Sequence, residues 1–405
     1  MLSRRTFLGL AAAAPFAARL LASPSTPRIV VIGAGAFGGW TAFHLRRLGA
    51  DVTLIDAWGP GNTRSSSGGE TRVIRAIYGA DRVYVEMVKR AYEWWEQLDA
   101  ELYAETGVLW MHRGDDGYVR SALPILRELG FPVDPLPVTD AARRYPQIKF
   151  DGIKSVWFER RAGALSARRA CVAVRDVFEK SGGVYRTAQA TPGAIANGSL
   201  KSVQLGDGSR VEADVFVFAC GPWLSRFFPD VIGRHIRPTR QEVFYFGTPA
   251  GSERFSVGQL PIWVDFGERI IYGIPDLKGR GFKVADDTRG DPIDPTGGDR
   301  TPSAQGIARA RRLLAERFPE MAKAPLIAAE VCQYENSPDG DLIVDHHPNA
   351  ANVWFVGGGS GHGFKLSPAV GEIAAQRILS GKEVPAQFRL ERLRNSKHGT
   401  QFETS

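Results

Sequence analysis

The chain has 405 residues, of which 43% are hydrophobic and 23% charged, and these values are ordinary for a folded globular protein large enough for two domains. The formal net charge of +7 is mild, and no block of Lys and Arg indicates nucleic-acid binding. The three cysteines are widely spaced and the seven histidines form no HxxxH pattern, so we predict neither a disulfide framework nor a metal site.

Residues 1–22 have the composition of an export signal. Arg4-Arg5 is followed by Phe7-Leu8, by an Ala-rich apolar run and by the segment SPSTP, which is the order of a secretory signal. Adjacent arginines before Phe-Leu are typical of a twin-arginine signal. We therefore expect the twin-arginine export machinery to carry the protein to the periplasm, with no membrane span after processing. The alternative is a frayed helix with two chance arginines.

The segment from Arg28 to Asp56 contains the strongest motif. A β-branched strand is followed by Gly33, Gly35 and Gly38 in the pattern GxGxxG, then by a helical pattern, a second strand and Asp56. The first glycine permits a tight turn, the second lets the backbone approach a pyrophosphate, and the third lets the helix pack against the sheet. The acid is placed to accept hydrogen bonds from an adenosine ribose. We therefore predict a dinucleotide site; the alternative is a structural glycine turn.

The rest of the N-terminal half alternates helical and strand patterns after a polar, glycine-rich loop at 58–79. That loop is a candidate cofactor cradle or an ordinary surface loop. The apolar spacing predicts helices over 83–102, 118–129, 140–144 and 167–181, and strands over 107–112, 184–190, 201–205 and 215–219.

The C-terminal half changes character. Alternating strands and turns over 237–284 predict an antiparallel sheet, followed by a loop at 286–301 and a helix at 303–318. A second strand–glycine–helix unit at 353–379 then indicates a discontinuous cofactor domain. We predict an α/β plus α+β fold, in which a Rossmann-type domain (28–82, 152–232 and 326–395) is interleaved with a substrate domain built on an antiparallel sheet (83–151 and 233–325).

Five motifs resemble one known family. GAGAFGG with Asp56, GETRVIRAIYG, YGIPDLKGRGFK, VCQYENSPDGDLIVDHHP and GGGSGHGFKLSPAVGE occur in that order from about residue 28 to about residue 378. They are similar to the monomeric sarcosine oxidase and N-methyltryptophan oxidase family, whose members are FAD amine oxidases of the D-amino acid oxidase-like group. The resemblance implies that the dinucleotide is FAD and that the second domain holds the substrate pocket.

The resemblance assigns roles to several residues of this chain. Cys332 matches a cysteine joined covalently to the flavin, and Lys283 matches a lysine near the flavin that promotes oxygen reduction. Arg75 and Lys365 match the two cations that bind the substrate carboxylate, and Arg72 matches an arginine beside the flavin. The alternatives are a buried structural cysteine, a solvated strand lysine and, for Arg75, a salt bridge with Glu70 or Asp81.

Other positions follow from the same motifs. His362 and Tyr272 match catalytic pocket residues, and Tyr334 matches an aromatic residue beside the pocket. The residues expected against the flavin are Thr71, Gly357, Gly358 and Gly361. Two departures alter the expected pocket shape: Gly68 stands where the family often has a histidine, and Trp263 stands where smaller or flexible residues occur. Trp263 is therefore expected to contact the substrate, and sarcosine itself is in doubt.

These expectations combine into one predicted function. The protein oxidises a secondary amine, an N-methyl or cyclic α-amino acid, with FAD as cofactor and oxygen reduced to hydrogen peroxide. We also expect a monomer. The alternatives are an FAD-dependent amino-acid dehydrogenase with a non-oxygen acceptor, and a flavin-bearing electron-transfer or structural protein without amine turnover.

Overall fold

The computed structural model describes residues 26–394. The predicted export signal at 1–22 lies outside the described residues and stays a prediction. The helices are α1 Ala36–Arg47, α2 Arg82–Leu98, α3 Gly117–Leu129, α4 Val138–Arg144, α5 Ala167–Lys180, α6 Leu224–Phe227, α7 Ala304–Arg317 and α8 Ser367–Ser380. The strands are β1 Arg28–Ile32, β2 Asp51–Asp56, β3 Thr71–Ile74, β4 Tyr103–Glu105, β5 Val108–His112, β6 Val133–Pro135, β7 Ser155–Glu159, β8 Gly163–Ser166, β9 Val184–Thr187, β10 Ala190–Pro192, β11 Ile195–Ala196, β12 Ser199–Leu200, β13 Ser202–Leu205, β14 Arg210–Glu212, β15 Val215–Phe218, β16 Arg237–Phe246, β17 Ile262–Phe266, β18 Ile270–Ile274, β19 Phe282–Asp286, β20 Leu326–Asn336, β21 Ile343–His347 and β22 Ala350–Gly357.

A six-stranded sheet holds the glycine motif. Its strand order is β21-β22-β15-β1-β2-β9, and β1 pairs in parallel with both β2 and β15. Alternate residues of β1 enter two different cores: Ile29 and Val31 pack in the cluster that contains residues of α1 and α8, and Val30 and Ile32 pack in the cluster of β12, β13 and α6. A strand covered on both faces needs a continuous apolar run, which explains the sequence of β1.

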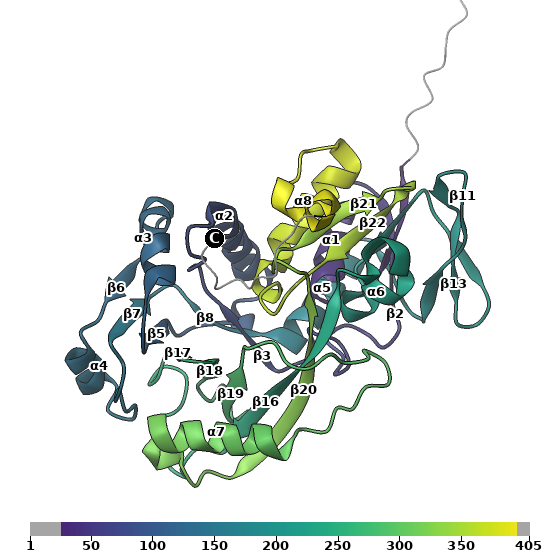
Figure 1. Ribbon diagram of the computed structural model, residues 1–405. Helices are drawn as coiled ribbons and strands as arrows, with labels where there is room; N and C mark the ends of the chain where they lie inside the picture. The colour runs from purple at the N-terminus through teal and green to yellow at the C-terminus, as the bar shows by residue number, and fades with distance from the viewer. Residues whose placement is uncertain (1–25, 395–405) are drawn as a thin grey trace, which may run out of the picture.

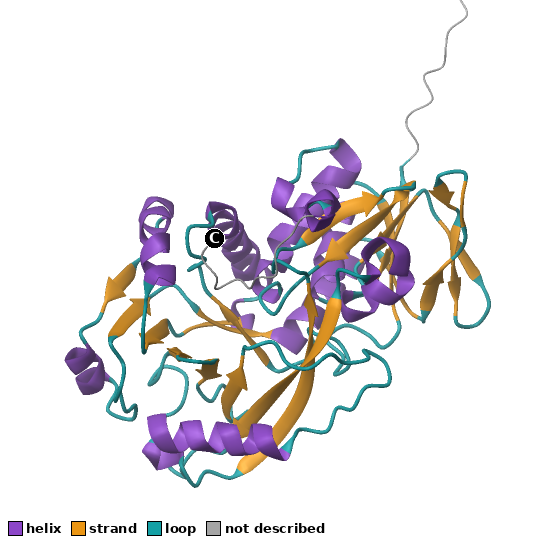
Figure 2. Ribbon diagram, viewed as in Figure 1, coloured by secondary structure: helices purple, strands orange, loops and turns teal. Residues whose placement is uncertain are grey.

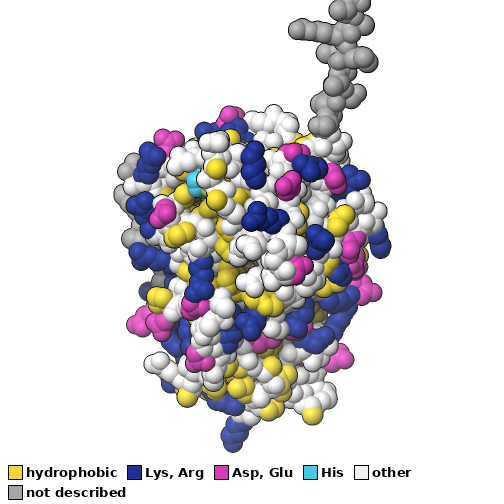
Figure 3. Space-filling model, turned by 90° about the vertical axis from the view of Figure 1, so that its right-hand side faces the viewer, with side chains coloured by type: hydrophobic (Ala, Val, Ile, Leu, Met, Phe, Trp, Pro, Cys, Tyr) yellow, Lys and Arg dark blue, Asp and Glu magenta, His cyan; other side chains and the backbone are white. Residues whose placement is uncertain are grey.

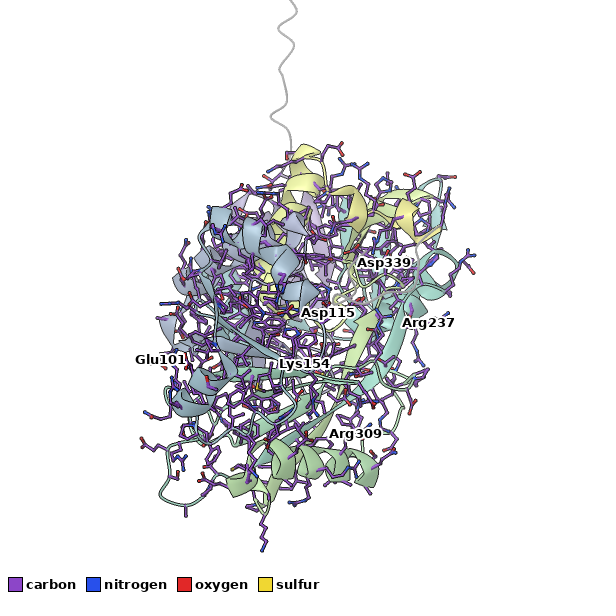
Figure 4. The ribbon with its side chains drawn as sticks, turned by 60° about the vertical axis from the view of Figure 1, so that its left-hand side comes forward. Glu101, Asp115, Lys154, Arg237, Arg309 and Asp339 are labelled. Atoms are coloured by element: carbon purple, nitrogen blue, oxygen red, sulfur yellow. The ribbon has the colours of Figure 1, made fainter. Side chains whose placement is uncertain are left out.

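An eight-stranded, mainly antiparallel sheet forms the second part of the molecule (Figures 1 and 2). Its order is β20-β16-β19-β18-β17-β5-β7-β6, and only β17 and β5 among these neighbours pair in parallel. Helix α7 covers the lower face of this sheet in Figure 1, and Figure 4 labels Arg309 on that helix. Leu313, Leu314 and Phe318 pack there against Trp263 and Phe282. The opposite face lines a cavity together with residues of β3 and of the turn that follows β22.

The sheet topology corrects two predicted domain boundaries. Strands β7 and β20 fell within the segments 152–232 and 326–395 that we assigned to the cofactor domain, but both belong to the eight-stranded sheet. Strand β20 pairs with β16 along its length, from Arg237 opposite Asn336 to Phe246 opposite Leu326. The predicted strand at 184–190 is likewise two strands, β9 and β10, in different sheets. Sheet membership depends on distant hydrogen-bond partners, which the alternation of apolar residues does not specify.

The described helices otherwise follow the apolar spacing closely. The predicted helices at 83–102, 118–129, 167–181 and 303–318 correspond to α2, α3, α5 and α7 within a few residues. Ser303 caps α7 by accepting a hydrogen bond from Gly306 N at 3.0 Å. In the described range, 26–394, no helix has the length and apolar character needed to cross a membrane. On the face shown in Figure 3, cationic and anionic side chains are interspersed.

Candidate active site

The glycine motif and Asp56 form one end of a cavity of about 370 Å³. Gly33 has φ +103°, and a Cβ atom there would lie 2.3 Å from the carbonyl oxygen of Ala219. A Cβ on Gly38 would lie 1.8 Å from the carbonyl oxygen of Gly33, so Gly38 allows close packing of α1 and does not itself line the cavity. Gly35 does line the cavity, as expected for a backbone that approaches a ligand.

Asp56 is fixed by the backbone around it. Its carboxylate accepts hydrogen bonds from the backbone N–H groups of Ala34 at 2.7 Å, Trp58 at 2.9 Å and Gly59 at 2.8 Å. Burial raises the pKa of Asp56, and these three N–H groups oppose the rise. A carboxylate has about four acceptor sites, so one remains for a ribose hydroxyl in the cavity that Asp56 lines.

A second, smaller cavity of about 70 Å³ adjoins the first. Four residues line both cavities: Arg72, Tyr334, Gly361 and Phe364. Because one water needs roughly 10–15 Å³ by this measure, the smaller cavity has room for a ligand of only a few heavy atoms. The geometry therefore places a small-molecule site against one end of an elongated site.

Two buried cations border the smaller cavity. Arg75 and Lys365 are each 5% exposed, and Arg75 donates a hydrogen bond to the carbonyl oxygen of Ile77. The guanidinium carbon of Arg75 lies 4.4 Å from the ring centroid of Tyr78. Burial, followed by the charge of Arg75, holds the pKa of Lys365 well below its usual value. Glu70 pairs with Arg168 and Arg280 instead of Arg75, and Asp81 caps α2.

Tyr78 connects this cation to His362 through a directional hydrogen-bond chain. Lys365 Nζ donates to the Tyr78 hydroxyl at 3.0 Å, which lies 3.1 Å from His362 Nδ1. His362 Nε2 lies 2.9 Å from the carbonyl oxygen of Gly340, so Nε2 must donate and Nδ1 must accept. Burial and then the charge of Lys365 lower the pKa of His362 well below its usual value. His362 is therefore a neutral ring with both nitrogens engaged.

A buried carboxyl lies behind the cations. Glu159 is 0% exposed, accepts a hydrogen bond from Trp110 Nε1 at 3.1 Å and another from Ala76 N. Burial raises the pKa of Glu159 to about 7, although the Ala76 N–H and the charge of Arg75 lower it. Neither Glu159 nor Tyr78 is predicted from the sequence, where the only local signal is the position of Tyr78 within the GETRVIRAIYG motif.

A second missed acid is Asp287, the residue after β19, which contacts Tyr334 of β20. The Tyr334 hydroxyl donates to Asp287 Oδ1 at 2.7 Å, and both residues line the smaller cavity with Tyr272. Burial raises the pKa of Asp287, while the Tyr334 hydrogen bond and the charge of Arg75 lower it. The available signal was the pair of acids, Asp286 and Asp287, at the end of the strand that contains Lys283.

Arg72 lines both cavities, whereas Lys283 lines neither and lies behind Arg72, because both side chains donate to the carbonyl oxygen of Thr71. Arg72 Nη2 lies 3.5 Å from Cys332 Sγ, and Cys332 lines the smaller cavity. Lys283 is 1% exposed and its Nζ donates to the carbonyl oxygen of Thr71 at 3.0 Å. Burial and then the charge of Arg72 lower the pKa of Lys283 to about 7. The alternative of a solvated strand lysine is therefore wrong.

Comparisons with known proteins identify the family. The family model described as "FAD dependent oxidoreductase" (DAO) matches residues 28–377. The chain belongs to the DAO family of FAD-dependent oxidoreductases. Monomeric sarcosine oxidase from Arthrobacter sp. is 30% identical over 87% of this chain and 92% of its own length. N-methyl-L-tryptophan oxidase from Salmonella arizonae is 26% identical over 87% of this chain and 94% of its own length.

Solved structures share the fold. L-proline dehydrogenase from P. horikoshii has a TM-score of 0.79 at 21% identity, covering 93% of this chain and 100% of that one. A modified fructosyl peptide oxidase from Aspergillus nidulans also has a TM-score of 0.79, at 19% identity, covering 92% of this chain and 97% of that one. The predicted Rossmann-type domain with an interleaved substrate domain is thus the fold of this DAO protein.

The larger cavity fits the FAD of a DAO-family protein. It extends from Asp56 and the glycine turn to Tyr334 and Phe364, so one molecule can place its adenosine at Asp56 and its flavin beside the smaller cavity. The N-terminus of α1 lies at the turn, and the positive end of its helix dipole favours a pyrophosphate. Gly33, Gly35, Asp56 and Gly361 would hold FAD, and the group supplies redox chemistry at the junction of the two cavities.

Several predicted contacts differ from the structure. Trp263 does not line the smaller cavity: it is 0% exposed and packs on the α7 side of the sheet, with ring centroids 6.2 Å from Phe282 and 4.9 Å from Phe318. The expectation that Trp263 contacts substrate is wrong, and its neighbour Val264 lines the cavity instead. Thr71, Gly357 and Gly358 do not line the larger cavity, where Gly359, Gly361 and Gly363 do.

Proposed function

We propose that this protein oxidises a secondary amine that also carries a carboxylate, of the N-methyl or cyclic α-amino acid class. The observation that supports it is the pair of buried cations, Arg75 and Lys365, at a cavity of about 70 Å³ next to the FAD cavity. Arg offers a planar fork and Lys a point charge to a carboxylate. The names of the sarcosine oxidase and N-methyl-L-tryptophan oxidase relatives support the same class.

Each wall of the cavity has a distinct task in this proposal. Arg75 and Lys365 bind the carboxylate, and Tyr78 holds Lys365 in place. Asp287 and Tyr334 line the same cavity, and the Asp287 carboxylate takes the ammonium proton, leaving the neutral amine. His362 orients Tyr78, because both of its ring nitrogens are engaged. A bound FAD would supply the hydride acceptor for oxidation of the carbon next to nitrogen.

Flavin reduction under anaerobic conditions tests the substrate class. Bleaching of the flavin absorbance should be fast with N-methyl and cyclic α-amino acids, and at least tenfold slower with the matching amine that lacks a carboxylate. Asp287→Asn should slow bleaching most at low pH, where the amine is protonated, while Arg254→Ala, at an exposed ion pair with Glu320, serves as the matched control. No bleaching with any amino acid of the panel would refute the proposal.

Oxygen is the proposed electron acceptor. The buried Lys283, which shares the carbonyl oxygen of Thr71 with the cavity residue Arg72, supports this because fixed positive charge stabilises developing superoxide. The alternative is a dehydrogenase that uses another acceptor. Peroxide release in air would identify an oxidase, and turnover only with added dyes would identify a dehydrogenase.

Covalent attachment of FAD through Cys332, export and a monomeric state complete the proposal. Support for the attachment is the position of the thiol in the wall of the smaller cavity, where Arg72 Nη2 lies 3.5 Å from Cys332 Sγ. Support for export by the twin-arginine route is the sequence of residues 1–22. The relatives named as monomeric sarcosine oxidases support a monomer.

A further inference from the structure

Glu335 has a buried carboxyl group that plays no part in the proposed amine oxidation. It lies near the end of β20, is 5% exposed, and lines the FAD cavity beside Tyr334 and Gly359. Its Oε1 is buried and has no hydrogen-bond partner among the described residues. Burying a carboxyl oxygen without a partner costs free energy, so the position calls for an explanation.

The backbone around Glu335 is shaped to admit this side chain. A Cβ atom on Gly357, the last residue of β22, would lie 2.5 Å from Glu335 Oε1. Glycine at 357 therefore leaves the space that the carboxyl occupies. Glu335 also fixes the following turn, because its carbonyl oxygen accepts a hydrogen bond from Ser360 N at 3.0 Å. The Glu335 carboxyl therefore fits a defined space in the wall of the FAD cavity, where β20 meets the glycine-rich turn after β22.

Burial favours the neutral form of this carboxyl. Burial raises the pKa of Glu335 to about 7, although the N–H groups of Gly358 and Gly359 lower it. A bound FAD adds two negative phosphate charges to the same cavity, and like charges favour the neutral acid further. A neutral carboxylic acid has one O–H donor, and the flavin ring and its ribityl chain offer acceptors.

We propose that Glu335 is a cofactor-binding residue, which donates a hydrogen bond from its neutral carboxyl group to the flavin half of FAD. The flavin half is favoured over the adenosine half because Glu335 adjoins Tyr334, which lines both cavities, whereas Asp56 marks the other end. The inference requires only FAD binding and is independent of the substrate proposed above.

The test measures FAD affinity in protein with Cys332→Ser, so that the flavin can be removed and rebound. Quenching of flavin fluorescence gives the dissociation constant. Glu335→Ala should weaken FAD binding about 10- to 100-fold, the effect of losing a hydrogen bond to a buried polar group. Glu335→Gln, which keeps an N–H donor of similar shape, should stay within about threefold of the parent. FAD binding by Glu335→Ala within threefold of the parent would overturn the proposal.

Two controls separate binding from folding. Asn336→Ala removes the next side chain of β20, whose Nδ2 donates to Thr239 Oγ1 at 2.8 Å and does not line the FAD cavity; it should lower the melting temperature without changing FAD affinity. ADP, which lacks the flavin half, should bind equally to the parent and to Glu335→Ala. An equal loss of ADP affinity, or a loss in Glu335→Gln as large as in Glu335→Ala, would contradict the assignment.

Discussion

Replacing Lys283 by methionine removes a buried charge and keeps most of the side-chain volume. Lys283 is 1% exposed, and its Nζ donates to the carbonyl oxygen of Thr71 at 3.0 Å. Burial and the nearby Arg72 lower its pKa from 10.5 to about 7. The folded protein therefore holds the charged form at a cost in stability, and we expect Lys283→Met to be more stable than the wild type at neutral pH.

The size of the effect follows from the pKa. At about 1.4 kcal/mol per pKa unit, a shift from 10.5 to about 7 corresponds to roughly 4 kcal/mol of destabilisation at pH 7. The carbonyl oxygen of Thr71 keeps Arg72 Nη1 as a donor at 2.8 Å, so the lost hydrogen bond costs only about 1 kcal/mol. The net gain is on the order of 3 kcal/mol.

The stability difference between Lys283→Met and the wild type should depend on pH. Between the folded pKa near 7 and the unfolded value near 10.5, the unfolded chain binds more protons at Lys283, so wild-type stability rises with pH in this window. The advantage of Lys283→Met should be full below about pH 7, shrink as the pH rises, and give way above about pH 10.5 to a deficit of about 1 kcal/mol from the lost hydrogen bond. Urea unfolding at matched flavin content measures it, with the exposed Lys278→Met as control. A variant that is less stable at pH 7, or an advantage independent of pH, would refute the reasoning.

The same substitution should impair function. Removing one preorganised electrostatic group costs about 100- to 1,000-fold in the step that it assists. Flavin reduction by substrate should therefore survive Lys283→Met, while reoxidation by oxygen falls by about 100-fold or more in stopped-flow measurements. Reoxidation at the wild-type rate would exclude a role of Lys283 in oxygen reduction and weaken the case for an oxidase.

Three further predictions concern the other parts of the proposal. Arg75→Ala should weaken substrate binding by about 100-fold, the scale of a lost charge-assisted pair, and leave reoxidation near normal; normal binding in stopped-flow titration would rule out the clamp. Acid precipitation of the wild type should leave the yellow colour in the pellet, and Cys332→Ala should release it; colour in the wild-type supernatant would exclude covalent FAD. A reporter fused after Ser23 should reach the periplasm only with Arg4 and Arg5, and equal export with both changed to lysine would contradict the twin-arginine route.

Local sequence decided the dinucleotide half of the fold. The glycines, the strand at 29–32 and Asp56 lie within one continuous segment, and each acts on its immediate neighbours: Asp56 binds the N–H groups of Ala34 and Gly59, and Gly38 packs on Gly33. A feature whose partners are near in the chain can be predicted from the chain. The same reasoning explains why α2, α3, α5 and α7 were predicted within a few residues.

The tertiary structure alone decided which side chains face the substrate cavity. Side chains of a strand alternate between its two faces, so one residue of register separates Val264 in the cavity from Trp263 in the core. Three residues of the site, Tyr78, Glu159 and Asp287, come from different parts of the chain. Their roles depend on partners far away in the sequence: Tyr78 contacts Lys365, and Asp287 contacts Tyr334. Burial also sets their charge, as it does for Lys283. The sequence specifies which residue types are present. The packing of the sheets determines which of these residues are in contact, and their burial determines their pKa values.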